Sequence, residues 1–579
     1  MTLKLEFYHI HKYVVTSILV TLVSSSYVPC LCMVSSRNQT VIEPSCTTTT
    51  YRIKAQGGNI SPVNAVSAAK TTECPLWFVH NNVTKQCECG NELGGTVHCD
   101  HEKNRVYIID CYCMTHDNQV GTVVGSCATN IVVRKSNTSF GSYNQLPSNI
   151  TQLNEAMCGQ HWNRSGRFCG RCKNNHYKSV FSYDFGCIEC SDSQLKYNWI
   201  KYIAFVFVPL TVFFVLTLII RIDATHQLPN GLVAYAQIIA MPTNVRFALA
   251  IATSYPKASP FIHIVATVYG FWNLDFLRTV LPATCLKIST LQAISLDYTT
   301  AFYPLILVVI TYILIELYDN GCVMVVWMWK PFGKCLDIKS SAIIAFSAFL
   351  RLSYAKLLSV TFDLLVPVWA HNVSGKPVGV YLYYDANVVY FGNEHLPYVI
   401  LAVFVMLAFI ILPILLLVAY PLRFCKFLWK WPALCICLDT YQGYYKDGTE
   451  GTRDCRWFSC IYLIVRILLF AAFSFVKYTS FYLFATFICL FVTLLHVVVN
   501  PYKTKYSKYN KIHSLLTLNM AIFFMAVVCI DVTSIESVHT NTFSIIVCGF
   551  SAVIPLLYGL VHLLHHLYLC LFRYFHLRE

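Results

Sequence analysis

The sequence predicts a mostly α-helical, polytopic membrane bundle of about nine transmembrane helices with an N-terminal, disulfide-rich ectodomain of loops and β-strands. Of the 579 residues, 56% are apolar and only 12% are charged, about half the charged fraction of a soluble domain. Long apolar stretches fill the chain from residue 199 onward, whereas 15 of the 27 cysteines lie before it. These observations exclude an ordinary soluble protein.

The net charge of +14 does not indicate a nucleic-acid-binding protein. The lysines and arginines are spread thinly among apolar stretches and form no extended basic patch. We therefore expect the lipid bilayer, and no nucleic acid, as a partner of the chain.

Residues 1–26 have the pattern of a secretory signal peptide. Lys4 and Lys12 precede an apolar run of eleven residues, 13–23, which three serines follow. This run is too short to cross a bilayer, which needs roughly 20 residues. An uncleaved core helix is the alternative interpretation. With a signal peptide, residues 27–198 become an extracellular, cysteine-rich ectodomain.

Glycosylation sequons support this assignment. Six Asn-X-Ser/Thr sequons lie in the same part of the chain as the clustered cysteines, and a seventh lies in a later loop. We expect glycans on Asn38, Asn59, Asn82, Asn137, Asn149, Asn163 and Asn372.

The ectodomain cysteines are disulfide candidates, because a small domain with little apolar surface needs cross-links. The candidates are Cys74, Cys87, Cys89, Cys99, Cys111, Cys113, Cys127, Cys158, Cys169, Cys172, Cys187 and Cys190. The last four also have nearly the spacing of a zinc ribbon, but zinc needs thiolates, which oxidise in the secretory pathway. Disulfides are the favoured interpretation and zinc the alternative. The spacing leaves the connectivity open.

Nine apolar stretches predict the membrane helices. They lie at 199–220, 231–253, 297–318, 341–366, 397–420, 457–477, 480–500, 513–533 and 542–570. The weakest, 231–253, is interrupted by Pro242 and Arg246. A shorter apolar stretch, 258–272, is expected to be re-entrant or interfacial. The membrane domain thus covers 199–570 and leaves a cytoplasmic tail at 571–579.

Two independent tests orient these helices. With nine spans, the loop that carries Asn372 falls on the same side as the ectodomain. Loops predicted to be cytoplasmic contain sixteen lysines and arginines, against five in or at the edge of the outside loops after the ectodomain, as the positive-inside rule requires. We therefore expect a plasma-membrane protein with an extracellular N-terminus and a cytoplasmic C-terminus.

Four ionisable residues lie inside predicted spans, where a charge costs about 2.5 to 3.5 kcal/mol on insertion scales. They are Arg351, Lys356 and Asp363 in the fourth span and Arg466 in the sixth. The functional interpretation is a path for ions or anionic substrates, or a conformational latch between the two spans. The structural alternative, which we favour, is a set of buried salt bridges with snorkelling at the helix ends.

A basic linker joins the seventh and eighth spans. Its lysines are Lys503, Lys505, Lys508 and Lys511. Each lysine near an anionic surface is worth about 1 kcal/mol, which predicts anionic lipid at the cytoplasmic face as a partner. Topogenic charge explains the same residues, and both interpretations stay open.

Histidines in the last three spans suggest a further alternative, a haem-binding membrane oxidoreductase. They are His496, His513, His562, His565 and His566. Interfacial packing is the favoured explanation, and we expect no cofactor.

No sequence motif indicates an enzyme. The chain has no HExxH, no GxSxG and no kinase or dinucleotide fingerprint, and its glycine-containing stretch 441–456 lacks the GK[ST] ending of a phosphate-binding loop. We therefore expect no catalytic residue and no metal site.

Four strings of the sequence resemble a group of uncharacterised multi-pass cell-surface proteins from early-branching animals. They are 269–277 (YGFWNLDFL), 383–398 (YYDANVVYFGNEHLPY), 443–457 and NPYK at 500–503. The resemblance runs from around Cys158 to the end and implies no activity or site residue. The architecture is also distantly similar to that of fungal TRP-like proteins. The chain departs from that pattern because only about eight residues, 534–541, join its last two spans, which is too few for a pore loop.

Architecture predicts the function only in outline. We expect a receptor-like or channel-like cell-surface protein whose ectodomain binds an extracellular protein or small ligand and couples that binding to the helical bundle. A transporter or lipid-handling protein is the first alternative, favoured if Pro242 and Pro413 mark broken helices around a midplane site. The haem oxidoreductase is the second.

Overall fold

The computed structural model describes most of the membrane domain and parts of the preceding segment. The described residues are 49–52, 78–80, 87–89, 97–100, 105–108, 112–117, 121–126, 164–165, 171–172, 175–178, 187–220, 227–242, 274, 284–320, 338–372, 377–422, 430–449, 451–475, 479–533, 546–551, 553 and 557. Outside them lie the predicted signal peptide, six of the seven sequons, the stretch 258–272, the tail 571–579, and Cys74, Cys111, Cys127, Cys158 and Cys169.

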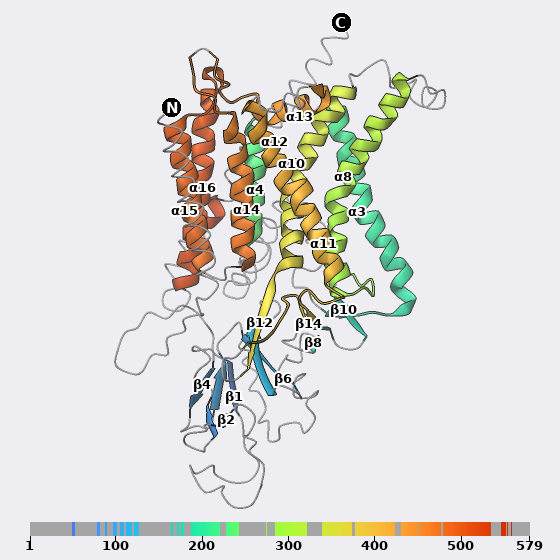
Figure 1. The fold of residues 1–579 in the computed structure, drawn as a ribbon, viewed down its shortest axis with the longest axis vertical. Coiled ribbons are helices and arrows are strands. Elements are labelled where there is room, and N and C mark those ends of the chain that lie inside the picture. Colours follow the sequence, from blue (N-terminus) through green and yellow to red (C-terminus); the bar gives the residue numbers. More distant parts are fainter. Residues whose placement is uncertain are drawn as a thin grey trace, which may run out of the picture.

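Helices form most of the described structure (Figure 1). Their bounds are α3 (Asp192–Ile220), α4 (Gln227–Pro242), α8 (Thr290–Asp319), α10 (Ile338–Leu365), α11 (Leu396–Val405), α12 (Leu412–Ala419), α13 (Pro432–Gln442), α14 (Ser459–Phe475), α15 (Thr479–Val499) and α16 (Ser507–Thr533). Seven stretches of the described chain are long and apolar enough to cross a membrane, and each falls on one of the nine predicted ranges. The helical membrane bundle is thus confirmed; α4 and the helical residues 546–551 lie in the other two ranges.

Local sequence signals explain where helices begin and bend. α8 begins with a capping box, in which Ser289 Oγ accepts the Gln292 N–H and Gln292 Oε1 accepts the Ser289 N–H. α11 continues into α12 through a π-helical turn, η5 (Met406–Ile411). The turn precedes Pro413, which has no N–H and whose ring clashes with the carbonyl one turn earlier in a regular α-helix.

Strands gather at one end of the bundle (Figure 1). Their bounds are β1 (Thr49–Arg52), β2 (Phe78–His80), β3 (Cys87–Cys89), β4 (Val97–Asp100), β5 (Arg105–Ile108), β6 (Tyr112–Asp117), β7 (Gly121–Ser126), β8 (Arg164–Ser165), β9 (Arg171–Cys172), β10 (His176–Lys178), β11 (Cys187–Glu189), β12 (Pro367–Asn372), β13 (Pro377–Leu382) and β14 (Asp385–Val389). The largest sheet has the order β14-β13-β12-β7-β6. Because β12–β14 lie between α10 and α11, this sheet joins the N-terminal segment to the bundle.

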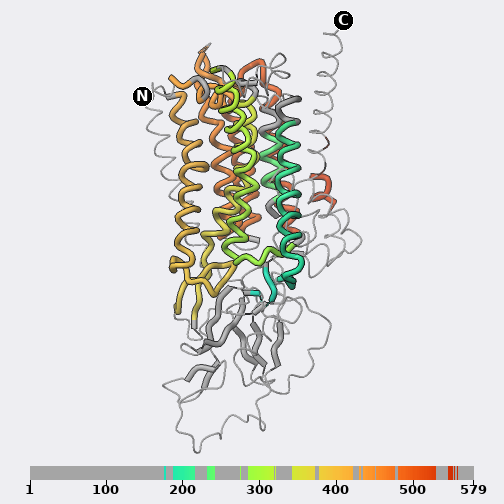
Figure 2. The backbone as a smooth tube through the Cα atoms, turned by 90° about the vertical axis from the view of Figure 1, so that its right-hand side faces the viewer, coloured from blue at the N-terminus to red at the C-terminus, as the bar shows by residue number. Residues whose placement is uncertain are grey.

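The two ends of the bundle differ. We call the end where α3 and α8 begin and α10 ends the strand end, and the opposite end, formed by α13 and residues 443–458 and 500–506, the loop end. Between them the helices run side by side along the long axis (Figure 2). The pairing of β7 with β12 places the Asn372 segment at the same end as the N-terminal strands, which is the relation that the sequence predicts.

Two disulfides fasten the beginning of α3. Cys172 is bonded to Cys187, and Cys190 is bonded to Cys285 in the segment before α8. Disulfide bonds are thus confirmed, and a bonded cysteine has no thiolate for zinc. The second bond requires α3 and α8 to begin at the same end of the bundle. Because α3 leads away from that end, the chain must return to it before α8, and α4 lies in this part of the sequence.

Peptide mapping without reduction should find Cys190 linked to Cys285. In Cys285→Ser the linked peptides should disappear and Cys190 should become accessible to a maleimide. In Cys172→Ser, the matched control, the link should remain. Reaction of both Cys190 and Cys285 with maleimide in unreduced wild-type protein would contradict the bond.

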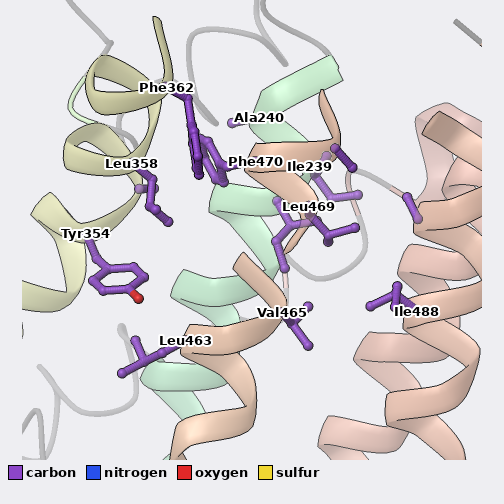
Figure 3. Close-up of a cluster of buried hydrophobic side chains, with 14 of the residues drawn as sticks. Ile239, Ala240, Tyr354, Leu358, Phe362, Leu463, Val465, Leu469, Phe470 and Ile488 are labelled. Carbon is purple, nitrogen blue, oxygen red and sulfur yellow. The ribbon is translucent and has the colours of Figure 1, made fainter. Parts of the chain in front are cut away.

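The largest apolar cluster includes side chains of α4, α10, α14 and α15, together with side chains of α8, α11, α12 and α16. Figure 3 shows Leu358 of α10, Phe470 of α14 and Ile239 of α4 directed into one cluster. Every residue of α4 from Gly231 to Ala240 is buried except Leu232, which is partly exposed. Gln237, the one amide side chain in this stretch, donates from Nε2 to Arg351 O and Leu352 O of α10. The other side chains are aliphatic, aromatic or absent, so α4 can pack at the centre of the bundle.

Candidate functional site

α10 carries many of the buried polar groups of the bundle. Arg351 and Lys356 are 5% and 3% exposed, and Ser347, Ser353 and Thr361 are fully buried. Inside a membrane such groups need partners on neighbouring helices. The partners of α10 on α8, α13, α14 and the β12–β14 insert therefore define the candidate site.

Lys356 forms a buried ion pair with Asp297 of α8. Its Nζ lies 3.2 Å from Asp297 Oδ2, and the two side chains are 3% and 13% exposed. Nearby, Tyr298 OH and Thr361 Oγ1 are 2.8 Å apart and join the same two helices. Lys356 thus lies in a salt bridge between the third and fourth predicted spans.

Asp363 lies near the strand end of α10. Its carboxylate accepts hydrogen bonds from Tyr384 OH at 2.9 Å and from Ser359 Oγ at 3.5 Å. Tyr384 belongs to the turn between β13 and β14. The charge therefore joins the membrane helix to the strand insert.

The insert also closes the C-terminal end of α10. The last four carbonyls of a helix have no partner within it. Here Leu364 O accepts from His395 Nε2 at 2.9 Å, and Leu365 O accepts from Tyr390 OH at 2.6 Å. His395 Nδ1 accepts the Phe391 N–H at 3.1 Å, which makes Nε2 the protonated nitrogen. Hydrogen bonds, and not a free linker, join α10 to the sheet.

At the loop end, Arg351 holds α13. Its Nη2 donates to Thr440 O at 2.8 Å, and its guanidinium carbon lies 3.8 Å from the centre of the Tyr441 ring. Tyr441 OH donates to Ser347 O at 3.3 Å. Burial raises the pKa of Tyr441 to about 12, so its hydroxyl stays protonated. A desolvated cation–π contact is worth about 2 kcal/mol, and α13 is thereby fixed to α10.

Arg466 is buried within α14 and lacks comparable partners. It is 3% exposed, and its Nε and Nη1 have no hydrogen-bond partner in the part of the chain that the structure describes. Its guanidinium carbon lies 5.7 Å from the centre of the Tyr354 ring of α10. An unsatisfied buried donor costs about 1 to 3 kcal/mol, and more when it is charged. Such a group needs an explanation.

One turn before Arg466, Tyr462 joins two buried histidines. Its hydroxyl lies 2.7 Å from His496 Nε2 of α15 and 2.8 Å from His513 Nδ1 of α16. A hydroxyl has one proton, so two such contacts require it to donate to one imidazole and accept an N–H from the other. Three helices therefore meet at one oxygen.

This contact does not fit haem with two histidine ligands. Axial ligation requires two imidazole nitrogens facing each other across an iron, whereas the nitrogens that the two rings direct toward each other, His496 Nε2 and His513 Nδ1, both contact the Tyr462 hydroxyl. The two rings are T-shaped, with centres 5.8 Å apart. His562, His565 and His566 lie outside the described residues.

An aromatic cluster of Tyr445, Phe458, Tyr502 and Tyr509 forms the loop end. The rings of Tyr445 and Tyr502 stack at 4.9 Å, and burial raises the pKa of Tyr445 to about 12. Two strings that stand out in the sequence, 443–457 and 500–503, thus pack against each other. Tyr502 OH lies 3.3 Å from His513 Nδ1, which connects this cluster to the histidines.

The four linker lysines divide into two groups. Lys503 pairs with Asp447 at 2.7 Å, and this contact holds the pKa of Asp447 below its usual range. Lys505, Lys508 and Lys511 are exposed at a spacing of three residues. These three are the ones free to contact an anionic surface.

Sequence reasoning missed three residues that complete these contacts. Asp297 is the first residue of a predicted span, and Cys285 lies outside the predicted ectodomain. Tyr462 is a tyrosine within a predicted span, with nothing in the sequence to distinguish it from the other tyrosines there. For Asp297 the sequence did contain a signal, because a carboxylate at the edge of one predicted span can pair with a lysine on the following span. No sequence signal marked the other two.

Comparison with protein-family models, curated proteins and solved structures finds no match for this chain. The class of the protein therefore rests on its own fold, a multi-helix membrane bundle with disulfides.

Proposed function

We propose that this protein is a receptor-like or channel-like protein of the plasma membrane, with the strand end extracellular and the loop end cytoplasmic. Its ectodomain binds an extracellular protein or small ligand and couples that binding to the bundle. The observation that carries the proposal is the shared sheet, in which His371 and Asn372 of β12 pair with Val124 and Val123 of β7.

From this sheet a continuous connection leads to the loop end. β12 follows α10 after one residue, Val366, and the insert is hydrogen-bonded to the last carbonyls of α10. α10 spans 28 residues and binds α13 through Arg351 at its other half. A displacement of β7 therefore has a hydrogen-bonded route to α13.

Fab fragments raised against the folded ectodomain can test this coupling, with hydrogen exchange of purified full-length protein as the readout. Fabs that displace the sheet containing β7 and β12 should change the rate of amide hydrogen exchange across residues 432–458. Val124→Pro should abolish the change, because proline removes an N–H from a strand with neighbours on both sides. Val389→Pro, on the edge strand β14, is the matched control and should retain it.

The Fabs must bind wild type and both variants equally well. A panel of such Fabs that alters exchange around β6 and β7 but never at 432–458 would overturn the coupling, as would an unchanged response in Val124→Pro.

A second candidate function, a transporter, is favoured by one observation. The π-helical turn η5 interrupts the fifth predicted span just before Pro413, and Tyr354 OH lies 3.5 Å from Ile410 O within it. Irregular turns of this kind occur frequently at functional sites. Flux of a labelled substrate into proteoliposomes, abolished by Pro413→Ala, would favour the transporter over the receptor.

A further inference from the structure

Arg466 takes no part in the connection from the sheet to α13. We propose that it forms the centre of a buried binding site for a small monovalent anion, of the size of chloride or formate. This site goes beyond the proposed function, because a receptor, a channel or a transporter could each contain it.

The first argument is the unsatisfied guanidinium. Nε and Nη1 of Arg466 have no acceptor among the described residues, although the side chain is almost completely buried. The apolar side chains of Val465 and Leu469, its neighbours on α14, are buried as well, so the helix cannot turn the guanidinium outward without exposing them. A buried charge persists in a folded protein when it is paired.

The second argument is the sign of the surrounding charge. The groups that act electrostatically on Arg466 are Tyr354, Tyr441, Arg351 and Tyr462. Arg351 is a second cation, and the three tyrosines carry neutral hydroxyls. Among the described residues, this set of neighbours contains no carboxylate. Arg351 and Arg466 lie on the adjacent helices α10 and α14, and two such cations in one bundle gain from an anion between or beside them.

The third argument is the supply of donors. A guanidinium presents parallel N–H groups that suit a carboxylate or a halide. Tyr354 OH has only a 3.5 Å contact with Ile410 O, which is too long for a strong hydrogen bond. Figure 3 shows this hydroxyl directed from α10 toward α14, so it can donate to the same anion. The 3% exposure of Arg466 selects a small ion over a lipid headgroup.

Thermal unfolding of the purified full-length protein in uncharged detergent tests the site. At equal ionic strength, the unfolding temperature of the wild type should rise with chloride or formate relative to gluconate, which is too large, and the rise should saturate. Arg466→Met should show no such dependence. In gluconate it should unfold at or above the wild-type temperature, because the variant buries no charge.

Two further variants separate the site from general salt effects. Arg466→Lys keeps the charge but loses the fork of donors, so the same shift should need about tenfold more chloride. Lys508→Met removes an exposed cation and should keep the wild-type dependence. An unfolding temperature independent of the anion in wild type, or an unchanged dependence in Arg466→Met, would overturn the proposal.

Wild-type protein alone provides a second measurement if Arg466→Met does not fold. Crystals grown in bromide should show an anomalous peak within hydrogen-bonding distance of Nε or Nη1 of Arg466, and a fully occupied bromide elsewhere with no peak here would contradict the site. Neither readout involves the ectodomain, so failure of the coupling proposal and failure of this one are distinguishable.

Discussion

Lys356→Met should destabilise the bundle by about 3 to 5 kcal/mol, the usual cost of breaking a buried ion pair from one side. The variant leaves the Asp297 carboxylate with 13% of its side chain exposed and without the ammonium group 3.2 Å away. Methionine is close to lysine in length and adds no strain, so the loss measures the cost of a buried Asp297 carboxylate that no longer has the ammonium group beside it. Equilibrium unfolding of the purified protein is the measurement.

The double variant Lys356→Met/Asp297→Leu should recover most of that loss. Replacing both members of a buried pair by apolar side chains of similar size is often neutral or stabilising. Lys508→Met, which removes an exposed lysine, is the control and should change stability by less than about 0.5 kcal/mol. A double variant less stable than Lys356→Met would show that the ion pair itself stabilises the bundle, and that the loss in Lys356→Met does not come from the Asp297 carboxylate that remains.

The membrane helices could be predicted because lipid leaves the backbone few choices. Without water, every N–H and C=O group must be satisfied within the helix, so an apolar stretch of about 20 residues has one stable conformation. The stretch 397–420 illustrates this, since Leu396–Ala419 is a membrane-length helix despite Pro413 and a π-helical turn.

The contacts between helices could not be predicted, because they depend on depth and rotation that periodicity does not fix. Arg351 and Lys356 were recognised from their cost in a membrane, but their partners Tyr441 and Asp297 lie 90 and 59 positions away. Neither pairing follows from spacing along the chain. The register of α10 against its neighbours decides both.

The connection through the sheet was hidden for a different reason. β7 and β12 belong to segments more than 240 positions apart, and each is a short strand whose pairing depends on how the domain folds. Sequence placed the Asn372 loop at the ectodomain side through topology alone. That inference gave the correct end of the bundle but no contact between the two segments.

Gly231→Ala should destabilise the bundle by about 1 to 3 kcal/mol, although alanine is the better helix former by about 1 kcal/mol. A Cβ at Gly231 of α4 would clash with Cε1 of His513 on α16 and would lie 2.8 Å from Nε2 and 2.9 Å from Nδ1 of the same ring. The imidazole cannot easily yield, because Tyr462 and Tyr502 hold it through Nδ1.

His513→Ala reverses the sign of this effect. His513→Ala removes the three atoms nearest to the new methyl group, so the helix propensity should dominate, and Gly231→Ala should then be neutral or stabilise by up to about 1 kcal/mol. Equilibrium unfolding of the four proteins in this double-mutant cycle measures the coupling. Stabilisation by Gly231→Ala in the wild-type background would mean that α4 and α16 do not approach so closely.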